Sequence, residues 1–65
     1  MTLIVNGEPR VVAAVTLAEA LQALDFVGAT VATALNGEFV PARARGAMQV
    51  KEGDRIEILA PRQGG

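Results

Sequence analysis

Two four-residue stretches, Val5-Asn6-Gly7-Glu8 and Leu35-Asn36-Gly37-Glu38, decide the fold of this 65-residue chain. Asn-Gly between β-prone residues is the strongest short-range hairpin signal, because both turn positions take a positive φ angle. The two stretches therefore predict two β-hairpins. Their spacing and number do not fit a solenoid, so we interpret them as one turn solution used twice.

Short β-prone runs extend outward from both turns. They fall at residues 2–5, 10–14, 31–35, 38–40 and 55–60. Glu8-Pro9 is expected to lengthen the first turn. Pro41 ends the return strand of the second hairpin, because proline cannot donate to a ladder. In the last run, alternate residues from Ile56 to Ala60 share one face, which leaves Leu59 on the other.

One helix is predicted between the hairpins. Thr16 and Glu19 have the spacing of a capping box, in which each side chain satisfies a backbone N–H group at the helix start. Apolar residues follow with the spacing of a buried helical stripe, at Leu17, Ala20, Leu21 and Leu24. Gly28 is the predicted stop. Residues 42–48 are expected to form a loop or a single helical turn, and Gln49-Val50 to pair briefly.

The order of elements is hairpin, helix, hairpin and final strand, which predicts an α+β fold. We expect a mixed sheet of about four to five strands packed on one main α-helix, with the first and last strands parallel at its centre. This is a β-grasp arrangement, with one domain at residues 1–60 and a flexible tail at 61–65. The predicted core consists of Leu3, Val5, Leu17, Leu21, Leu24, Leu35, Val40, Ile56 and Ile58.

The composition excludes several classes of function. The chain is 51% hydrophobic and its net charge is −1, so it has no basis for the basic face that nucleic-acid binding requires. It contains no histidine and no cysteine, which removes the usual catalytic pairs and the usual zinc ligands. No apolar run approaches the roughly 20 residues that span a bilayer. We therefore expect a cytoplasmic protein that is not an enzyme and binds no metal, nucleic acid or membrane.

The last residues, Pro61-Arg62-Gln63-Gly64-Gly65, have the composition of a reactive tail. A terminal glycine pair arises by chance in about one chain in 100, so it is a weak signal alone. After the last strand of a β-grasp domain it is more specific, because five residues extend roughly 15–18 Å and glycine passes through narrow channels. We predict that Arg62, Gln63 and Gly64 thread into a partner's active site. The Gly65 carboxylate reacts there after activation, for which the partner supplies ATP and magnesium.

The ordered set of motifs resembles the ThiS family of sulfur carriers in thiamine biosynthesis, which are ubiquitin-like β-grasp proteins. The resemblance covers essentially the whole chain and rests on residues 3–7, 16–21, 34–41, 51–59 and 63–65. It implies that a ThiF-type adenylyltransferase, which is E1-like, adenylates Gly65 with ATP. It also implies that a cysteine desulfurase or related persulfide donor supplies sulfur for a thiocarboxylate. A ThiG-type thiazole synthase would then take this sulfur, and the carrier itself would bind no cofactor.

Three apolar residues are candidates for a partner-docking patch. They are Leu59, Phe39 and Ile4, which alternation sets apart from the predicted core. One helix covers only one face of a small sheet, so apolar residues on the other face are available to a partner. The alternative is that these are ordinary scattered apolar residues.

The remaining polar candidates have structural interpretations. Asn6 and Asn36 are expected to serve their turns. Glu52 and Asp54 are expected to be turn residues rather than catalytic acids or metal ligands. Arg62 either pairs with acidic groups of a partner or is simply solvated.

Three other functions stay open at this stage. One is a sulfur carrier of another pathway, such as the small subunit of molybdopterin synthase, although those proteins are usually longer. Another is a ubiquitin-like protein modifier that is joined to target lysines. The last is a small interaction domain in which the two terminal glycines are incidental.

Overall fold

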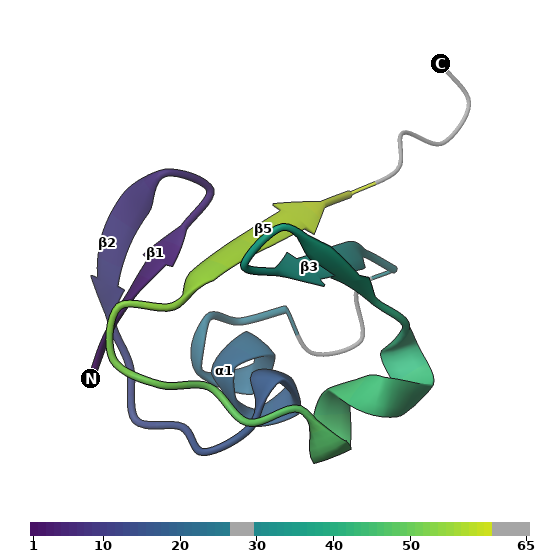
Figure 1. The fold of residues 1–65 in the computed structure, drawn as a ribbon, viewed down its shortest axis with the longest axis horizontal. Coiled ribbons are helices and arrows are strands. Elements are labelled where there is room, and N and C mark those ends of the chain that lie inside the picture. The colour runs from purple at the N-terminus through teal and green to yellow at the C-terminus, as the bar shows by residue number, and fades with distance from the viewer. Residues whose placement is uncertain (27–29, 61–65) are drawn as a thin grey trace.

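A five-stranded mixed sheet in the order β2-β1-β5-β3-β4 forms the framework of the chain (Figure 1). The computed structural model describes residues 1–26 and 30–60. Its elements are β1 (Thr2–Val5), β2 (Glu8–Val11), α1 (Leu17–Ala23), β3 (Ala32–Leu35), β4 (Glu38–Val40), the 3-10 helix η1 (Ala42–Ala47) and β5 (Arg55–Leu59). β1 and β5 are parallel, and the other pairs are antiparallel. The predicted α+β β-grasp with a central parallel pair is therefore confirmed.

Both Asn-Gly turns close in two residues. Asn6 and Asn36 each have φ 51°, and Gly7 and Gly37 have φ 85° and 87°. The prediction that Glu8-Pro9 lengthens the first turn is wrong, because Glu8 already pairs with Val5 and β2 runs from Glu8 to Val11 instead of 10–14. Pro9 is tolerated because β2 is an edge strand, where a missing backbone donor costs no ladder hydrogen bond.

The capping box at the start of α1 is present. The Glu19 backbone N–H donates to Thr16 Oγ1 at 3.2 Å, and Glu19 Oε1 accepts from the Val15 N–H at 2.7 Å. The helix ends at Ala23, and Asp25 follows with a positive φ of 70°. The stop predicted at Gly28 lies outside the described residues.

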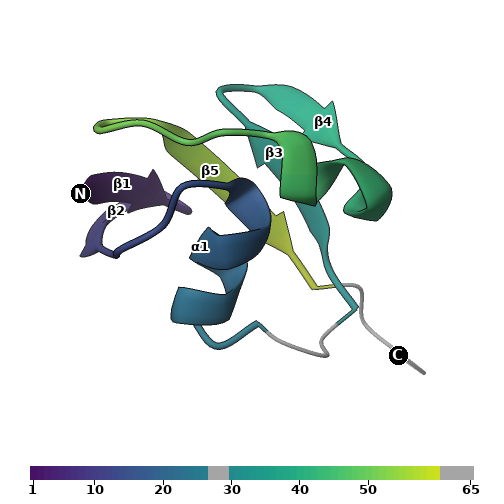
Figure 2. The ribbon, with the colours of Figure 1, turned by 90° about the horizontal axis from the view of Figure 1, so that it is seen from below.

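Figure 2 shows α1 against one face of the sheet. The buried side chains of the core come from this helix, from the strands and from the loops between them. All nine predicted core residues are buried, and Val12, Ala20 and Val50 join them. Residues 42–47 form η1, which packs Ala44 against the core. Gln49 makes the brief pairing expected for its segment, with Thr16 as its partner. The helix thus covers one face of the sheet and leaves the opposite face uncovered by α1. This opposite face is called the outer face.

Candidate functional site

The predicted reactive tail lies outside the described residues. Arg62, Gln63, Gly64 and Gly65 all belong to it, so their predicted roles stay predictions. The structure does describe the point from which the tail continues. β5 lies at the centre of the sheet and ends at Leu59, and Ala60 is the last described residue. The tail therefore continues in sequence from the end of the central strand.

The side chains of β5 alternate as expected. Ile56 and Ile58 are buried, whereas Arg55, Glu57 and Leu59 are exposed on the outer face. Ala60 follows β5 and is exposed, so it does not continue the buried face. The strand that leads into the tail thus carries one large apolar side chain outward, at its end.

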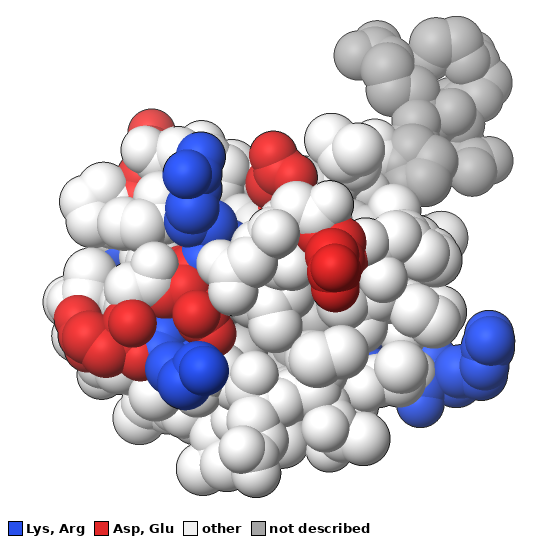
Figure 3. Space-filling model, in the orientation of Figure 1, with Lys and Arg blue, Asp and Glu red and all other residues white. Residues whose placement is uncertain are grey.

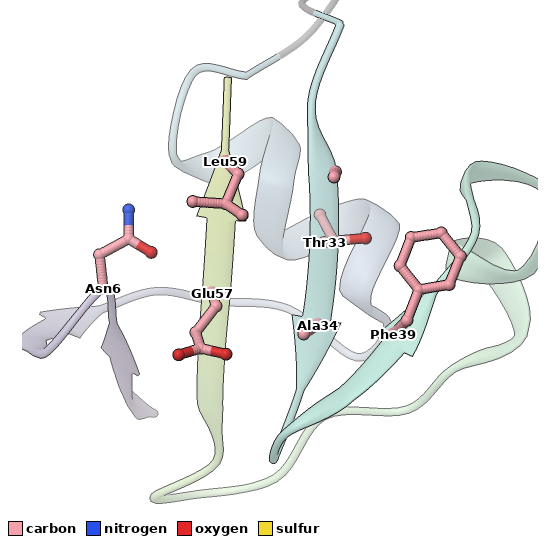
Figure 4. A pocket seen from close by; sticks show the side chains of 7 residues that line it. Asn6, Thr33, Ala34, Phe39, Glu57 and Leu59 are labelled. Atoms are coloured by element: carbon pink, nitrogen blue, oxygen red, sulfur yellow. The ribbon is translucent and has the colours of Figure 1, made fainter. Parts of the chain in front are cut away.

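A hollow on the outer face brings Leu59 and Phe39 together. Leu59 is 70% exposed and Phe39 is 71% exposed, and both line a space of about 220 Å³. The register places Ala32 opposite Leu59 and Ala34 opposite Phe39. Ala32 and Ala34 are small and line the same space, so they leave room between the two large residues. Figure 4 shows Ala34 between the strands that carry Leu59 and Phe39.

Glu57 and Asn6 border the same hollow on the side of β5 and β1 (Figure 4). Glu57 lies opposite Ala34 across the β3–β5 pair, so a carboxylate stands beside the apolar floor. The alternation along the last strand already placed Glu57 on the outer face. Its place across Ala34 from Phe39 could not be derived without knowing the order of the strands.

Ile4 does not join Leu59 and Phe39. It is half-buried and borders a separate hollow with Arg55 and Glu57. The parallel register places Ile4 beside Arg55, at the start of β5, whereas Leu59 is at its end. Of the three residues predicted to dock a partner, Leu59 and Phe39 thus line one hollow and Ile4 lines another, and their docking role stays a prediction.

The two turn asparagines reach further than their turns. Asn6 Oδ1 accepts from the Ile58 N–H at 2.8 Å, and Asn6 Nδ2 donates to the Ile58 carbonyl at 3.1 Å. Asn36 Oδ1 accepts from the Arg55 N–H at 2.9 Å, and its Nδ2 donates to Asp54 Oδ1 at 3.2 Å. The turns were predicted, but these contacts to β5 were missed. The available signal was that both turns use asparagine, whose amide carries a donor and an acceptor.

Glu52 and Asp54 are turn residues, as expected. Asp54 Oδ2 accepts from the Lys51 N–H at 2.8 Å, and Glu52 Oε1 accepts from the Thr2 N–H at 2.9 Å. Within residues 1–26 and 30–60, no three acidic side chains gather in a way that could hold a metal ion. Both carboxylates accept from backbone N–H groups, and Asp54 also accepts from the Asn36 side chain.

Charge of both signs is present side by side on the face drawn in Figure 3. Acidic and basic side chains alternate there toward the end of the sheet formed by β1 and β2, and no large area of one sign stands out. Among the helices that the structure describes, none has the length and apolar character needed to cross a membrane.

Comparison with known proteins gives one consistent result. The model of the ThiS family matches residues 3–65. A crystal structure titled as the thiamine biosynthesis protein ThiS from Geobacter metallireducens is 39% identical, with full coverage of both chains and a TM-score of 0.83. A solution NMR structure of a thiamine biosynthesis protein from the same organism is 38% identical and has a TM-score of 0.80, with 100% of this chain and 88% of that chain covered. No curated protein matches the chain. Because the family model spans nearly the whole sequence, this chain belongs to the ThiS family.

Proposed function

We propose that this chain is a sulfur carrier for the synthesis of the thiazole ring of thiamine. The observation that carries the proposal is the family match over residues 3–65, which includes the Gly64-Gly65 pair. The likeness to a thiamine biosynthesis protein over its full length supports the thiazole pathway over other sulfur-transfer pathways. The carrier acts as a substrate of its partners and catalyses nothing itself.

The proposed cycle takes place at the Gly65 carboxylate. Inside a ThiF-type adenylyltransferase, a carboxylate oxygen attacks the α-phosphorus of magnesium-bound ATP, and pyrophosphate leaves. The terminal sulfur of a persulfide, delivered by a cysteine desulfurase or a related donor, then attacks the acyl carbon and displaces AMP. A thiol reduces the resulting acyl disulfide, which releases the thiocarboxylate and forms a disulfide with the donor. A ThiG-type thiazole synthase removes the sulfur, and water restores the carboxylate.

Intact-mass measurement tests this cycle directly. The chain is incubated with the adenylyltransferase of the same genome, Mg·ATP, a cysteine desulfurase, cysteine and a thiol. We expect the mass gain of one sulfur replacing one oxygen at the C-terminus. The matched control lacks Gly65. It should fold equally well, because all described strands and helices lie before residue 60. It should gain no sulfur, because the glycine that is proposed to be activated is absent. No gain in the full chain, with partners that act on another carrier, would sink the proposal.

The same preparation separates the other carrier functions. Capture of a thiazole synthase by the thiocarboxylate form supports the thiazole pathway. Capture of a molybdopterin synthase large subunit instead would assign the chain to that pathway. Chains joined to target lysines in cells, without a detectable thiocarboxylate, would assign it to the protein modifiers.

The docking surface for the adenylyltransferase is the hollow between Leu59 and Phe39. Both side chains are more than two-thirds exposed, and an apolar pair of this kind gains free energy when a partner covers it. Leu59 ends the strand that leads to the tail, so a partner that holds Gly65 also lies against this end of the sheet. The proposed contact leaves out Ile4, since Ile4 lines a different hollow from Leu59 and Phe39.

Substitutions at the hollow test this docking surface. Leu59→Ser and Phe39→Ser should each raise the KM of the carrier in pyrophosphate release by about tenfold, since each removes an apolar contact of about 1.5 kcal/mol. Val11→Ser is the matched control, because Val11 is 81% exposed on β2 and does not line the hollow. Equal KM values for all three variants would show that the enzyme binds elsewhere.

A further inference from the structure

The end of β5 has a partner strand on one side only. On one side of β5, the parallel strand β1 pairs Ile4 with Arg55 and Val5 with Ile56, and β1 then ends. β5 continues to Leu59, where Ala32 of β3 still pairs with it. Among the described residues, no strand therefore lies beside Ile58 on the β1 side.

The Asn6 side chain occupies this place. The Asn6 backbone N–H donates to the Ile56 carbonyl at 2.9 Å, which is the last backbone contact between the β1 hairpin and β5. The carboxamide of the same residue then pairs with Ile58, accepting from its N–H at 2.8 Å and donating to its carbonyl at 3.1 Å. The Asn6 side chain thus replaces the next backbone pair of the β1–β5 ladder, at a point where the backbone of the first hairpin has already turned away from β5.

The turn alone does not require asparagine at this position. The positive φ of 51° at Asn6 is open to glycine and aspartate as well as asparagine. Glycine has no side chain to offer, and an ionised aspartate accepts hydrogen bonds but donates none. Only the amide satisfies both the N–H and the carbonyl of Ile58, so the choice of residue serves β5 as well as the turn.

The position of this contact gives it a functional meaning. Ile58 is followed by Leu59 and Ala60, after which the tail begins. The Asn6 side chain and Ala32 of β3 therefore hold the last part of β5 from its two sides. Loss of either contact removes one of the two partners that hold the end of β5.

We propose that Asn6 is a positioning residue for the sulfur-carrier reaction. It keeps β5 formed up to its end and so sets the point and direction from which the tail enters the adenylyltransferase. The inference rests on the proposed function. Without the Asn6 contacts, the end of β5 is open in part of the carrier population. The enzyme binds only the fraction in which this end is closed, so the apparent dissociation constant rises by the inverse of that fraction. Once the carrier has docked, the same carboxylate lies in the same site, so kcat is unchanged.

Asn6→Gly and Asn36→Gly form a matched pair for the test. Glycine accepts the positive φ of both turns, so neither substitution adds backbone strain. Each removes two side-chain hydrogen bonds: Asn6 loses both contacts to Ile58, and Asn36 loses its contacts to Arg55 and Asp54. The two variants differ in which end of β5 they release. They also differ in that Asn6 borders the hollow between Leu59 and Phe39 whereas Asn36 does not, so amide hydrogen exchange at Ile58 is measured together with KM.

Pyrophosphate release with the ThiF-type adenylyltransferase of the same genome and Mg·ATP is measured below the melting temperature of both variants. We expect Asn6→Gly to raise the KM of the carrier about tenfold and to leave kcat within about twofold, while Asn36→Gly changes neither by more than about twofold. Amide hydrogen exchange at Ile58 should accelerate in Asn6→Gly, and that at Arg55 in Asn36→Gly. If Asn6→Gly is too unstable to assay, Asn6→Asp keeps the acceptor for the Ile58 N–H and should raise KM by less.

The outcomes separate this inference from the proposed function. If the unaltered chain is not adenylated by that enzyme, the proposed function fails and the inference falls with it. If the unaltered chain is adenylated and the two glycine variants have the same KM, or if Asn6→Gly lowers only kcat, the inference alone is overturned.

Discussion

The two hairpins have the same turn and different relations to the rest of the molecule. Asn6 and Asn36 have the same φ angle, and the strands on either side pair in the same register. Asn6 reaches Ile58 near the end of β5, whereas Asn36 reaches Arg55 where β5 begins. The central strand is therefore held at one end by each hairpin.

Corresponding positions of the two hairpins also bury different residues. In the first, Leu3 of the inner strand is fully buried and its partner Arg10 is exposed. In the second, Thr33 of the inner strand is buried, and its partner Val40 on the edge strand is only 1% exposed. The inner strand carries the large apolar residue in the first hairpin, and the edge strand carries it in the second.

The chain that follows each hairpin accounts for this difference. After β4 the chain forms η1, which packs Ala44 against the core and donates from Arg45 to Thr33 Oγ1 and to the Val31 carbonyl. After β2 the chain leads directly to the start of α1, and every residue of β2 is exposed. The same local turn thus produces one hairpin whose edge strand buries a residue, Val40 of β4, and one whose edge strand, β2, buries none.

Val40→Ala and Arg10→Ala test this difference at corresponding positions, and the first has the largest expected effect. Val40→Ala removes two methyl groups from a closed site and should lower the free energy of unfolding by about 2 to 3 kcal/mol. Arg10→Ala changes an exposed edge residue and should cost less than about 0.5 kcal/mol. Urea unfolding of both variants measures the contrast. Similar losses of free energy in the two variants would mean that Arg10 of β2 contributes to the core as much as Val40 of β4 does.

The parts of the fold that depend on neighbours in the sequence were predictable. Two Asn-Gly turns, one capping box and the alternation of β5 led to the β-grasp order and to a correct set of core residues. The start of β2 was misplaced because Glu8 and Pro9 are poor strand formers by composition. Pairing with Val5 and the tolerance of an edge strand for proline override that preference.

The parts of the site that depend on the order of strands were not predictable. Alternation places Ile4, Phe39 and Leu59 outside the core, but it does not say which of them are neighbours. The sheet order separates Ile4 from Phe39 by two strands, and the register sets Ile4 at the far end of β5 from Leu59. The contact between Asn6 and Ile58 joins residues 52 positions apart, which no local pattern records.

Thr33→Val sharpens the comparison by making the second hairpin more like the first. The Thr33 hydroxyl donates to the Val40 carbonyl at 2.8 Å and accepts from Arg45 Nε at 2.9 Å. Valine has nearly the same shape but no hydroxyl, so the Val40 carbonyl and Arg45 Nε both lose a hydrogen-bond partner in a buried site. We therefore expect urea unfolding to show a loss of about 1.5 kcal/mol in the free energy of unfolding. Thr33→Ser is the control, because it keeps both hydrogen bonds and loses only a methyl group. A valine variant as stable as the original chain would show that this hairpin does not need its buried hydroxyl.

Gly7→Ala and Gly37→Ala test the one respect in which the hairpins should be equal, and their effect is the smallest. Both glycines have φ near +85° and no atom within 4 Å of an added Cβ, so the cost is conformational strain alone, about 1 kcal/mol in each turn. Gly46→Ala is the control, since its surroundings are also open within 4 Å and its φ is not in the left-handed region; it should be neutral or slightly stabilising. Thermal unfolding of the three variants provides the measurement. Unequal losses at Gly7 and Gly37 would show that the packing around each hairpin reaches into its turn, and the difference between the hairpins would then begin at the Asn-Gly pair itself.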